Sequence, residues 1–109
     1  MKTIPTLVSC ALFINVANVA MAADVAAGAA KAKEICSACH GVDGNSTDVN
    51  NPRLAGQHAD YLAKALRDYK SGERNNAIMK GFAAALSKKD IENLAAYFSS
   101  QPSSLSAKY

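Results

Sequence analysis

The apolar residues of this 109-residue chain fall into one continuous run and three stretches with helical character. The continuous run covers residues 4–19. At 57–70 and 87–100, apolar side chains recur three or four residues apart, which is the spacing of one face of a helix. A third stretch, 24–38, is rich in alanine, the strongest helix former. The pattern therefore predicts an all-α fold with three main helices.

Signals for helix ends and crossings flank these stretches. Asp24 can accept hydrogen bonds from free N–H groups at the start of the first helix. Ser87, with Asp90 three residues later, resembles a capping box, and Pro102 stops the last helix. Gly28 lies inside the first helix, where glycine costs about 1 kcal/mol relative to alanine. It indicates either a close crossing with another helix or a frayed first turn.

The segments between the helices have no regular apolar pattern. Residues 41–56 form a long polar connection, and loops of this length in a compact domain usually have a function or wrap around something. Residues 75–86 are predicted as a short irregular segment around Met79, where Gly81 permits a tight backbone path. The tail from about residue 101 is expected to be loose.

Residues 1–22 have the organisation of a secretory signal peptide. A basic n-region precedes the apolar run, and Ala20-Met21-Ala22 matches an A-x-A cleavage site. We expect cleavage there, which leaves 23–109 as a single domain without an integral membrane span. An uncleaved anchor is disfavoured because two asparagines interrupt the run, which is shorter than the roughly 20 apolar residues of a spanning helix. A lipoprotein site at Cys10 is disfavoured because too few apolar residues precede it.

Removal of this segment would simplify the reactive side chains. Loss of Lys2 lowers the net charge from +3 to +2. A charge this small gives no reason to expect binding to nucleic acid. Loss of Cys10 leaves Cys36 and Cys39 as the cysteines, and Met79 becomes the only methionine. A protein core alone is marginal in a domain of this size, which is a physical reason to expect a cofactor.

The sequence Cys36-Ser37-Ala38-Cys39-His40 has the attachment pattern of a c-type haem. Two thiols three positions apart lie on one side of a helical turn, where each can add to one vinyl group of the porphyrin. The imidazole of His40 follows directly and can bind the iron. A dithiol oxidoreductase is disfavoured because its C-x-x-C lies at a helix N-terminus, whereas this pair follows a helix. Structural zinc is disfavoured because no second Cys/His pair has ligand spacing.

Met79 is the candidate for the second axial ligand of the iron. It is the one soft ligand left in the mature chain, and a haem with one histidine ligand leaves its other face open. His58 is the alternative, but a histidine in the first turn of a helix is more often simply exposed. The carbonyl of Pro52 could accept the Nδ1–H of His40 and fix its tautomer. An ordinary turn proline is the equal alternative.

Five lysines could surround an exposed haem edge and dock acidic partners. A solvated surface explains them equally well. They are Lys64, Lys70, Lys80, Lys88 and Lys89.

Taken together, these residues resemble a class I c-type cytochrome of the small soluble bacterial monohaem type, similar to one half of the dihaem members. The resemblance spans essentially the whole mature sequence. It rests on Cys36-Ser37-Ala38-Cys39-His40-Gly41, Asn51-Pro52-Arg53-Leu54-Ala55-Gly56-Gln57, Tyr61-Leu62 with Leu66, Ile78-Met79-Lys80-Gly81 and Leu94-Ala95-Ala96-Tyr97-Phe98. Many relatives carry a proline close before the ligand methionine, and this chain has Asn76-Ala77-Ile78 there.

The resemblance implies a small cytochrome c fold, in which three main helices and a short helical segment wrap around one covalently bound haem c. It implies thioether links at Cys36 and Cys39, axial ligation by His40 and Met79, and a hydrogen bond from His40 to the Pro52 carbonyl. It also implies that Gly28 lets the first helix cross the last helix near Tyr97.

The function implied is that of a periplasmic single-electron carrier rather than an enzyme. Its implied partners are a membrane quinol-oxidising complex and a terminal oxidase or periplasmic reductase. The alternative is a haem peroxidase or small-gas sensor, which requires Met79 to leave the iron readily. A subunit docked permanently on a larger oxidoreductase would have the same haem chemistry.

Overall fold

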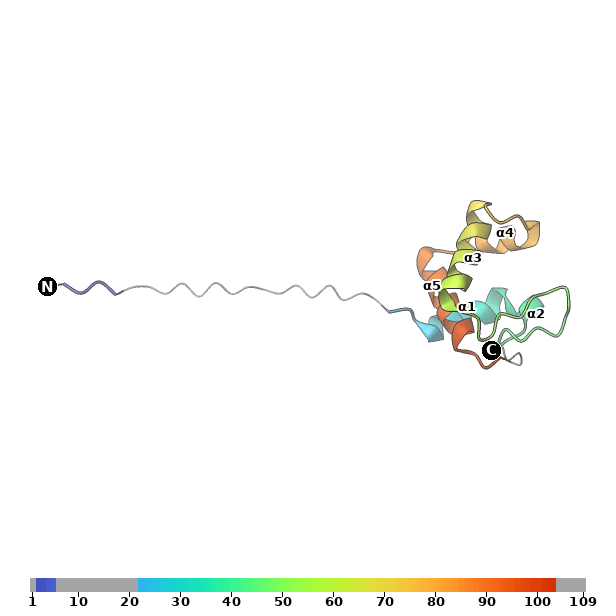
Figure 1. The fold of residues 1–109 in the computed structure, drawn as a ribbon, viewed down its shortest axis with the longest axis horizontal. Helices are drawn as coiled ribbons and strands as arrows, with labels where there is room; N and C mark the ends of the chain where they lie inside the picture. The colour runs from blue at the N-terminus through green and yellow to red at the C-terminus, as the bar shows by residue number, and fades with distance from the viewer. Residues whose placement is uncertain (1, 6–21, 104–109) are drawn as a thin grey trace, which may run out of the picture.

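The computed structural model describes residues 2–5 and 22–103, and the predicted signal peptide lies almost entirely outside the described residues. The described residues are all-helical, as expected (Figure 1). They form five helices in chain order: α1 (Val25–Ile35), α2 (Ser37–His40), α3 (Ala59–Ser71), α4 (Ala77–Ala83) and α5 (Lys88–Ser100). None of these helices is both long and apolar enough to cross a membrane.

Two of the helix predictions need correction. The first predicted helix, 24–38, stops at Ile35, and the chain turns at Cys36 (φ −107°, ψ −30°) before the four-residue helix α2. Residues 75–86 are not irregular, because helix α4 forms there. Asn76 caps α4 by accepting a hydrogen bond from the backbone N–H of Met79, at 3.0 Å. The short helical segment that the family resemblance implied is therefore present.

The predicted caps of the long helices are confirmed. The Asp24 side chain accepts from the Ala27 N–H at 3.0 Å and begins α1. Ser87 and Asp90 form both hydrogen bonds of a capping box at the start of α5, each at 3.0 Å. The backbone bond to Ser87 lowers the pKa of the Asp90 carboxyl. Such a cap contributes about 1 kcal/mol to helix stability.

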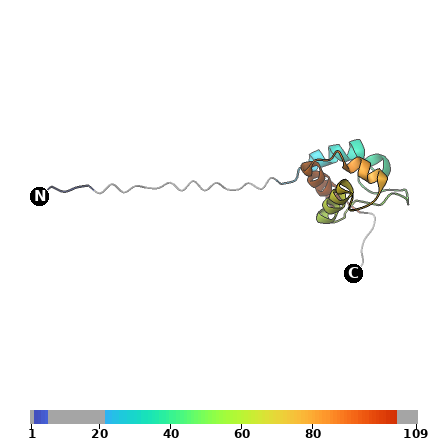
Figure 2. The same ribbon diagram turned by 90° about the horizontal axis from the view of Figure 1, so that it is seen from above.

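Helix α5 is the centre of the packing, since it lies against both α1 and α3, while α4 packs on α3 (Figures 1 and 2). At the core, apolar side chains from four helices and the connection before α5 meet. They are Ala32, Leu62, Ala83, Leu86, Ile91, Leu94, Ala95 and Phe98.

Helices α1 and α5 cross closely at Gly28. A Cβ added at Gly28 would lie 2.1 Å from the backbone oxygen of Asn93 and 3.0 Å from the Cβ of Tyr97. The buried Asn93 side chain accepts from the Asp24 N–H at 2.8 Å, which fixes the start of α1 against α5. The crossing near Tyr97 is therefore confirmed, and the frayed first turn is excluded.

The connection 41–56 is folded against α5. Gly44 is buried with φ +81°, and a Cβ there would lie 2.7 Å from the Phe98 ring. The Gly56 N–H donates to the Phe98 carbonyl at 3.0 Å, and the Tyr97 hydroxyl donates to the Val42 carbonyl at 2.8 Å. Between these points, the Ser46 hydroxyl donates to the Cys39 carbonyl at 3.4 Å, so the segment also contacts α2.

The C-terminal tail is described only as far as residue 103. Its first part is held, because the Pro102 carbonyl accepts a hydrogen bond from the Asn45 side chain at 2.9 Å. The remainder, 104–109, for which a loose tail was expected, lies outside the described residues.

We predict that Gly28→Ala destabilises the domain by about 1–3 kcal/mol, because the new methyl group collides with backbone atoms of α5 that cannot rotate away. The better helix propensity of alanine offsets only part of this cost. Denaturant unfolding followed by far-UV circular dichroism measures the change. Ala30→Ser, at an exposed position of α1, is the control, and a Gly28→Ala protein as stable as the wild type would contradict the tight crossing.

Candidate functional site

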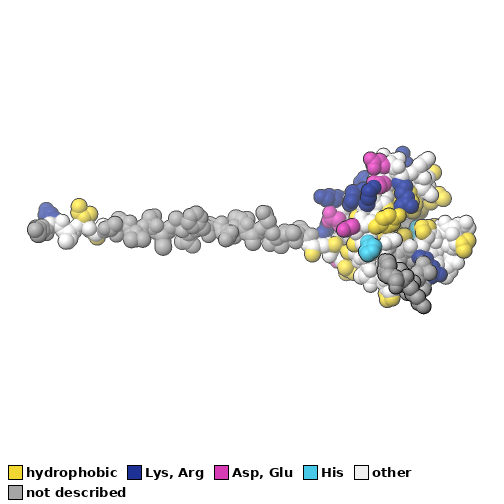
Figure 3. Space-filling model, in the orientation of Figure 1, with side chains coloured by type: hydrophobic (Ala, Val, Ile, Leu, Met, Phe, Trp, Pro, Cys, Tyr) yellow, Lys and Arg dark blue, Asp and Glu magenta, His cyan; other side chains and the backbone are white. Residues whose placement is uncertain are grey.

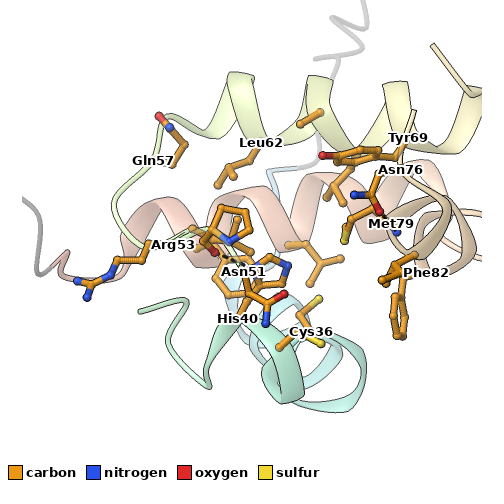
Figure 4. Close-up of a pocket in the computed structure, with 18 of the residues that line it drawn as sticks. Cys36, His40, Asn51, Arg53, Gln57, Leu62, Tyr69, Asn76, Met79 and Phe82 are labelled. Atoms are coloured by element: carbon orange, nitrogen blue, oxygen red, sulfur yellow. Dashed lines mark hydrogen bonds between the residues drawn. The ribbon is translucent and has the colours of Figure 1, made fainter. Parts of the chain in front are cut away.

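One cavity brings together the residues that were predicted for the site. It has a volume of about 350 Å³ and lies between α2, the connection before α3, and helices α3, α4 and α5. Cys36, Cys39, His40, Pro52 and Met79 all line it. Figure 4 shows Cys36 and His40 reaching into this space from the end that carries α2, and Met79 from the side of α4.

The two thiols lie where α1 gives way to α2. Cys36 is half-buried and Cys39 is exposed. The backbone carbonyl of Cys36 accepts from the N–H of His40 at 3.0 Å, so the turn that starts at Cys36 sets the place of the imidazole. Burial raises the pKa of the Cys36 thiol to about 11. A thiol whose pKa is raised by burial is poorly suited to thiol–disulfide exchange.

The His40 side chain is 8% exposed and has a defined partner. Its Nδ1 atom lies 2.7 Å from the carbonyl oxygen of Pro52. Since a carbonyl oxygen only accepts, Nδ1 carries the proton and donates it. The lone pair of Nε2 is then available for a metal.

Of the two candidates for a second axial ligand, only Met79 lines the cavity. Met79 is half-buried in the first turn of α4. His58 is the exposed N-cap residue of α3, and it is not among the cavity residues. Gly81 lies inside α4 without a positive φ, and an added Cβ would meet no atom of the described chain within 4 Å. The backbone therefore does not need glycine there, contrary to the expectation of a tight path.

The walls of the cavity are apolar, and several of them are open to solvent. Leu62, Leu94 and Phe98 form the buried part. Ile78 and Phe82, from α4, also line the cavity but are 69% and 45% exposed. Large apolar side chains around a concave site favour a large apolar occupant.

Arg74 is a cavity residue that was not among the predicted site residues. Its guanidinium carbon lies 4.8 Å from the centroid of the Tyr69 ring, and its NH1 group donates to the Tyr61 hydroxyl at 3.4 Å. The hydrogen bond to Tyr61 raises the pKa of Arg74. The signal in the sequence was weak, because only the folded turn after α3 brings Arg74 back to the Tyr69 ring and the Tyr61 hydroxyl.

Comparison with known proteins agrees with this site. The family model described as Cytochrome c matches residues 25–102, which include the whole helical domain. The chain belongs to the cytochrome c family. The cofactor of this family is a covalently bound haem c, and Cys36 and Cys39 have the spacing of its attachment motif.

Three relatives illustrate how the length of this chain compares with that of known cytochromes. Cytochrome c4 of Pseudomonas aeruginosa is 48% identical over 100 residues, which cover 91% of this chain and 49% of that protein. The crystal structure of reduced cytochrome c4 from Pseudomonas stutzeri matches with a TM-score of 0.72 at 46% identity and covers 77% of this chain and 48% of the other. Cytochrome c-554(548) of Halomonas halodenitrificans is 45% identical over 83 residues, which cover 73% of this chain and 99% of that protein.

The chain thus spans about half the length of the cytochromes c4 that it matches. It spans nearly the whole length of the cytochrome c-554(548). The cytochrome c domain seen here is therefore similar to one half of a cytochrome c4.

The cavity of this cytochrome fits a haem by the chemistry of its lining. Apolar walls suit the flat porphyrin, and the thiols and His40 at one end are groups that can attach a haem and bind its iron. Polar side chains that can donate hydrogen bonds to the propionates also line the cavity. They are Asn50, Asn51, Arg53, Gln57, Arg74 and Asn76.

The five lysines named above are not part of the cavity wall. Lys70 and Lys88 instead line a separate groove with Arg67 and Ile91, between α3 and α5, and Lys64 pairs with Asp68. Figure 3 shows lysine and arginine side chains gathered on one part of the helical domain.

We predict that Asn76→Ala loosens the start of α4, because it removes the side chain that accepts the Met79 N–H. Loss of an N-cap costs about 1 kcal/mol. We expect amide hydrogen exchange in α4 to accelerate about fivefold, as measured by mass spectrometry. Asn75→Ala, one residue earlier and also exposed, is the matched control, and equal exchange in the two variants would argue against the cap.

Proposed function

We propose that this cytochrome is a periplasmic single-electron carrier that holds one haem c between His40 and Met79. The observation that carries the proposal is that one cavity gathers two thiols, a nearly buried imidazole and a thioether from different helices. In this proposal, Cys36 and Cys39 hold the haem by thioether bonds, and the two other side chains bind its iron from opposite faces.

Neighbouring residues position these groups and shield the cavity. The Pro52 carbonyl holds the proton of His40 at Nδ1, so that the lone pair of Nε2 is free to bind the iron. Asn76 caps α4 and fixes the backbone that carries Met79. Leu62, Leu94 and Phe98 exclude water from the inner wall.

This set of residues suits electron transfer better than substrate chemistry. A bound haem supplies an iron that takes up or gives back one electron. Protein ligands on both faces leave no position for a substrate, and a methionine ligand raises the reduction potential. An apolar wall disfavours the more highly charged oxidised form and raises the potential further. We therefore propose a carrier rather than an enzyme.

The compartment and the partners follow from the same proposal. Residues 1–22 would direct export and be removed, and export fits an attachment chemistry that needs two cysteines outside the reducing cytosol. A quinol-oxidising membrane complex would supply the electron, and a terminal oxidase or periplasmic reductase would accept it. The cytochromes c4 are about twice as long as this chain. A role as one part of a larger protein would use the same haem chemistry.

Single replacements of the two cysteines test the attachment. We expect Cys36→Ser and Cys39→Ser each to retain haem through one remaining thioether, whereas the double variant loses covalent haem. Haem staining after denaturing electrophoresis, together with intact mass, measures this. Haem that stayed covalently bound in the double variant would place the attachment elsewhere.

Replacement of Met79 tests the axial ligand. We expect wild-type ferric protein to be low-spin with the weak red sulfur-to-iron absorption band. Met79→Ala should abolish this band and let the iron bind added imidazole or, when reduced, carbon monoxide. His58→Ala, at the exposed start of α3, is the control and should leave the band unchanged.

Two outcomes would redirect the proposal. A band that survives Met79→Ala would mean that another group binds the iron. A wild-type protein that is high-spin and binds carbon monoxide or peroxide readily would favour the alternative function of a haem peroxidase or gas sensor.

A further inference from the structure

Helix α4, which carries Met79, makes few packing contacts with the rest of the described chain. It packs chiefly against α3, and Ala83 is its one buried residue. The rest of α4 is exposed or half-buried, including Ile78 and Phe82. The direction in which α4 leaves α3 therefore depends strongly on the short connection between them, residues 72–76.

The backbone of this connection turns tightly at the end of α3. Gly72 adopts a left-handed conformation (φ +90°) as the C-cap. The N–H groups of Gly72 and Arg74 both donate to the Asp68 carbonyl at 3.0 Å. This turn returns the chain toward α3. The side chain of Arg74 can therefore reach back to that helix.

The side chain of Arg74 fastens the connection to the cavity-facing side of α3. Tyr61 and Tyr69 are eight residues apart, about two helical turns, so both rings lie on the same side of α3. The guanidinium stacks on Tyr69 at 4.8 Å and donates to the Tyr61 hydroxyl at 3.4 Å. All three residues line the cavity. Two residues further on, Asn76 caps α4 at the Met79 N–H.

We infer that Arg74, clasped between Tyr61 and Tyr69, is a positioning residue that holds Met79 ready to bind the haem iron. This inference rests on the proposed ligation by Met79. Arg74 does not touch the iron in this account. It restrains the connection, the connection sets the start of α4, and α4 presents the thioether. Without the clasp, Met79 competes less well with an added ligand.

The experiment measures competition between Met79 and imidazole in the ferric holoprotein, followed by loss of the sulfur-to-iron band. We expect Arg74→Gln to bind imidazole about three- to tenfold more tightly than the wild type, the size expected for loss of one exposed cation–π contact and one long, exposed hydrogen bond of 3.4 Å. Arg74→Lys should fall between the two, because an ammonium group can lie over Tyr69 but lacks the planar fork that also reaches Tyr61.

Two matched variants keep the test specific. Arg67→Gln makes the same chemical change on another side of α3, at a residue that lines the separate groove, and should bind imidazole like the wild type. Tyr61→Phe removes only the hydroxyl and should act in the same direction as Arg74→Gln, but less. The double variant Arg74→Gln/Tyr61→Phe should bind imidazole no more tightly than Arg74→Gln alone, because both changes break one clasp.

The outcomes separate this inference from the proposal beneath it. A wild-type protein without the sulfur band would overturn both. A normal band with unchanged imidazole affinity in Arg74→Gln would overturn the clasp alone, even if thermal stability fell. A changed pH dependence of the reduction potential, with unchanged imidazole affinity, would assign Arg74 to a haem propionate and equally overturn its role at Met79.

Discussion

The stability of this small domain depends on covering the apolar walls of its cavity. Among the described residues, Leu94 is the one large side chain that is less than 2% exposed, so the polypeptide encloses only a small core by itself. Around the cavity, Tyr61, Ile78 and Phe82 remain 50%, 69% and 45% exposed. Apolar surface of this extent is unfavourable in water at roughly 25 cal/mol per Å². A porphyrin in the cavity would complete the core, so cofactor binding and folding are two aspects of one packing problem.

The turn at Cys36, between α1 and α2, relates the position of the two thiols to that of the His40 imidazole. If α1 continued through residue 40, the imidazole would follow the direction of that helix. The turn starts α2 instead and brings His40 within 2.7 Å of the Pro52 carbonyl. That carbonyl belongs to the long connection, which α5 holds through Gly44 and Gly56. The hydrogen bond between His40 and Pro52, together with that from the Ser46 hydroxyl to the Cys39 carbonyl at 3.4 Å, thus links the motif to the connection. A change in the connection would alter the orientation of the histidine.

The sequence predicted best those features that are encoded by neighbouring residues. The caps at Asp24 and at Ser87 with Asp90 are local signals, as is the C-x-x-C-H spacing, and Gly28 stood out because glycine is unfavourable inside a helix. The apolar pattern did not predict helix α4, because seven residues are too few to show a period, and the short helical segment was implied by the family resemblance alone. The clasp of Arg74 was missed because it depends on a turn that returns the chain to its own preceding helix. The place of the lysines depends on how α3 and α5 rotate against each other, which a periodic pattern does not fix.

The separation of charge from the cavity limits how this cytochrome can recognise a partner. Electrons pass most readily where the haem lies nearest the surface, and the residues around the cavity are apolar or neutral apart from Arg53 and Arg74. The groove formed by Arg67, Lys70 and Lys88 lies elsewhere, between α3 and α5. Long-range attraction to an acidic partner acts on the whole charge distribution, whereas the final contact is set by the surface that meets the partner. Under the proposed function, basic charge placed away from the cavity can orient the molecule during approach, while the apolar side chains around α4 would set how closely the redox centres come together.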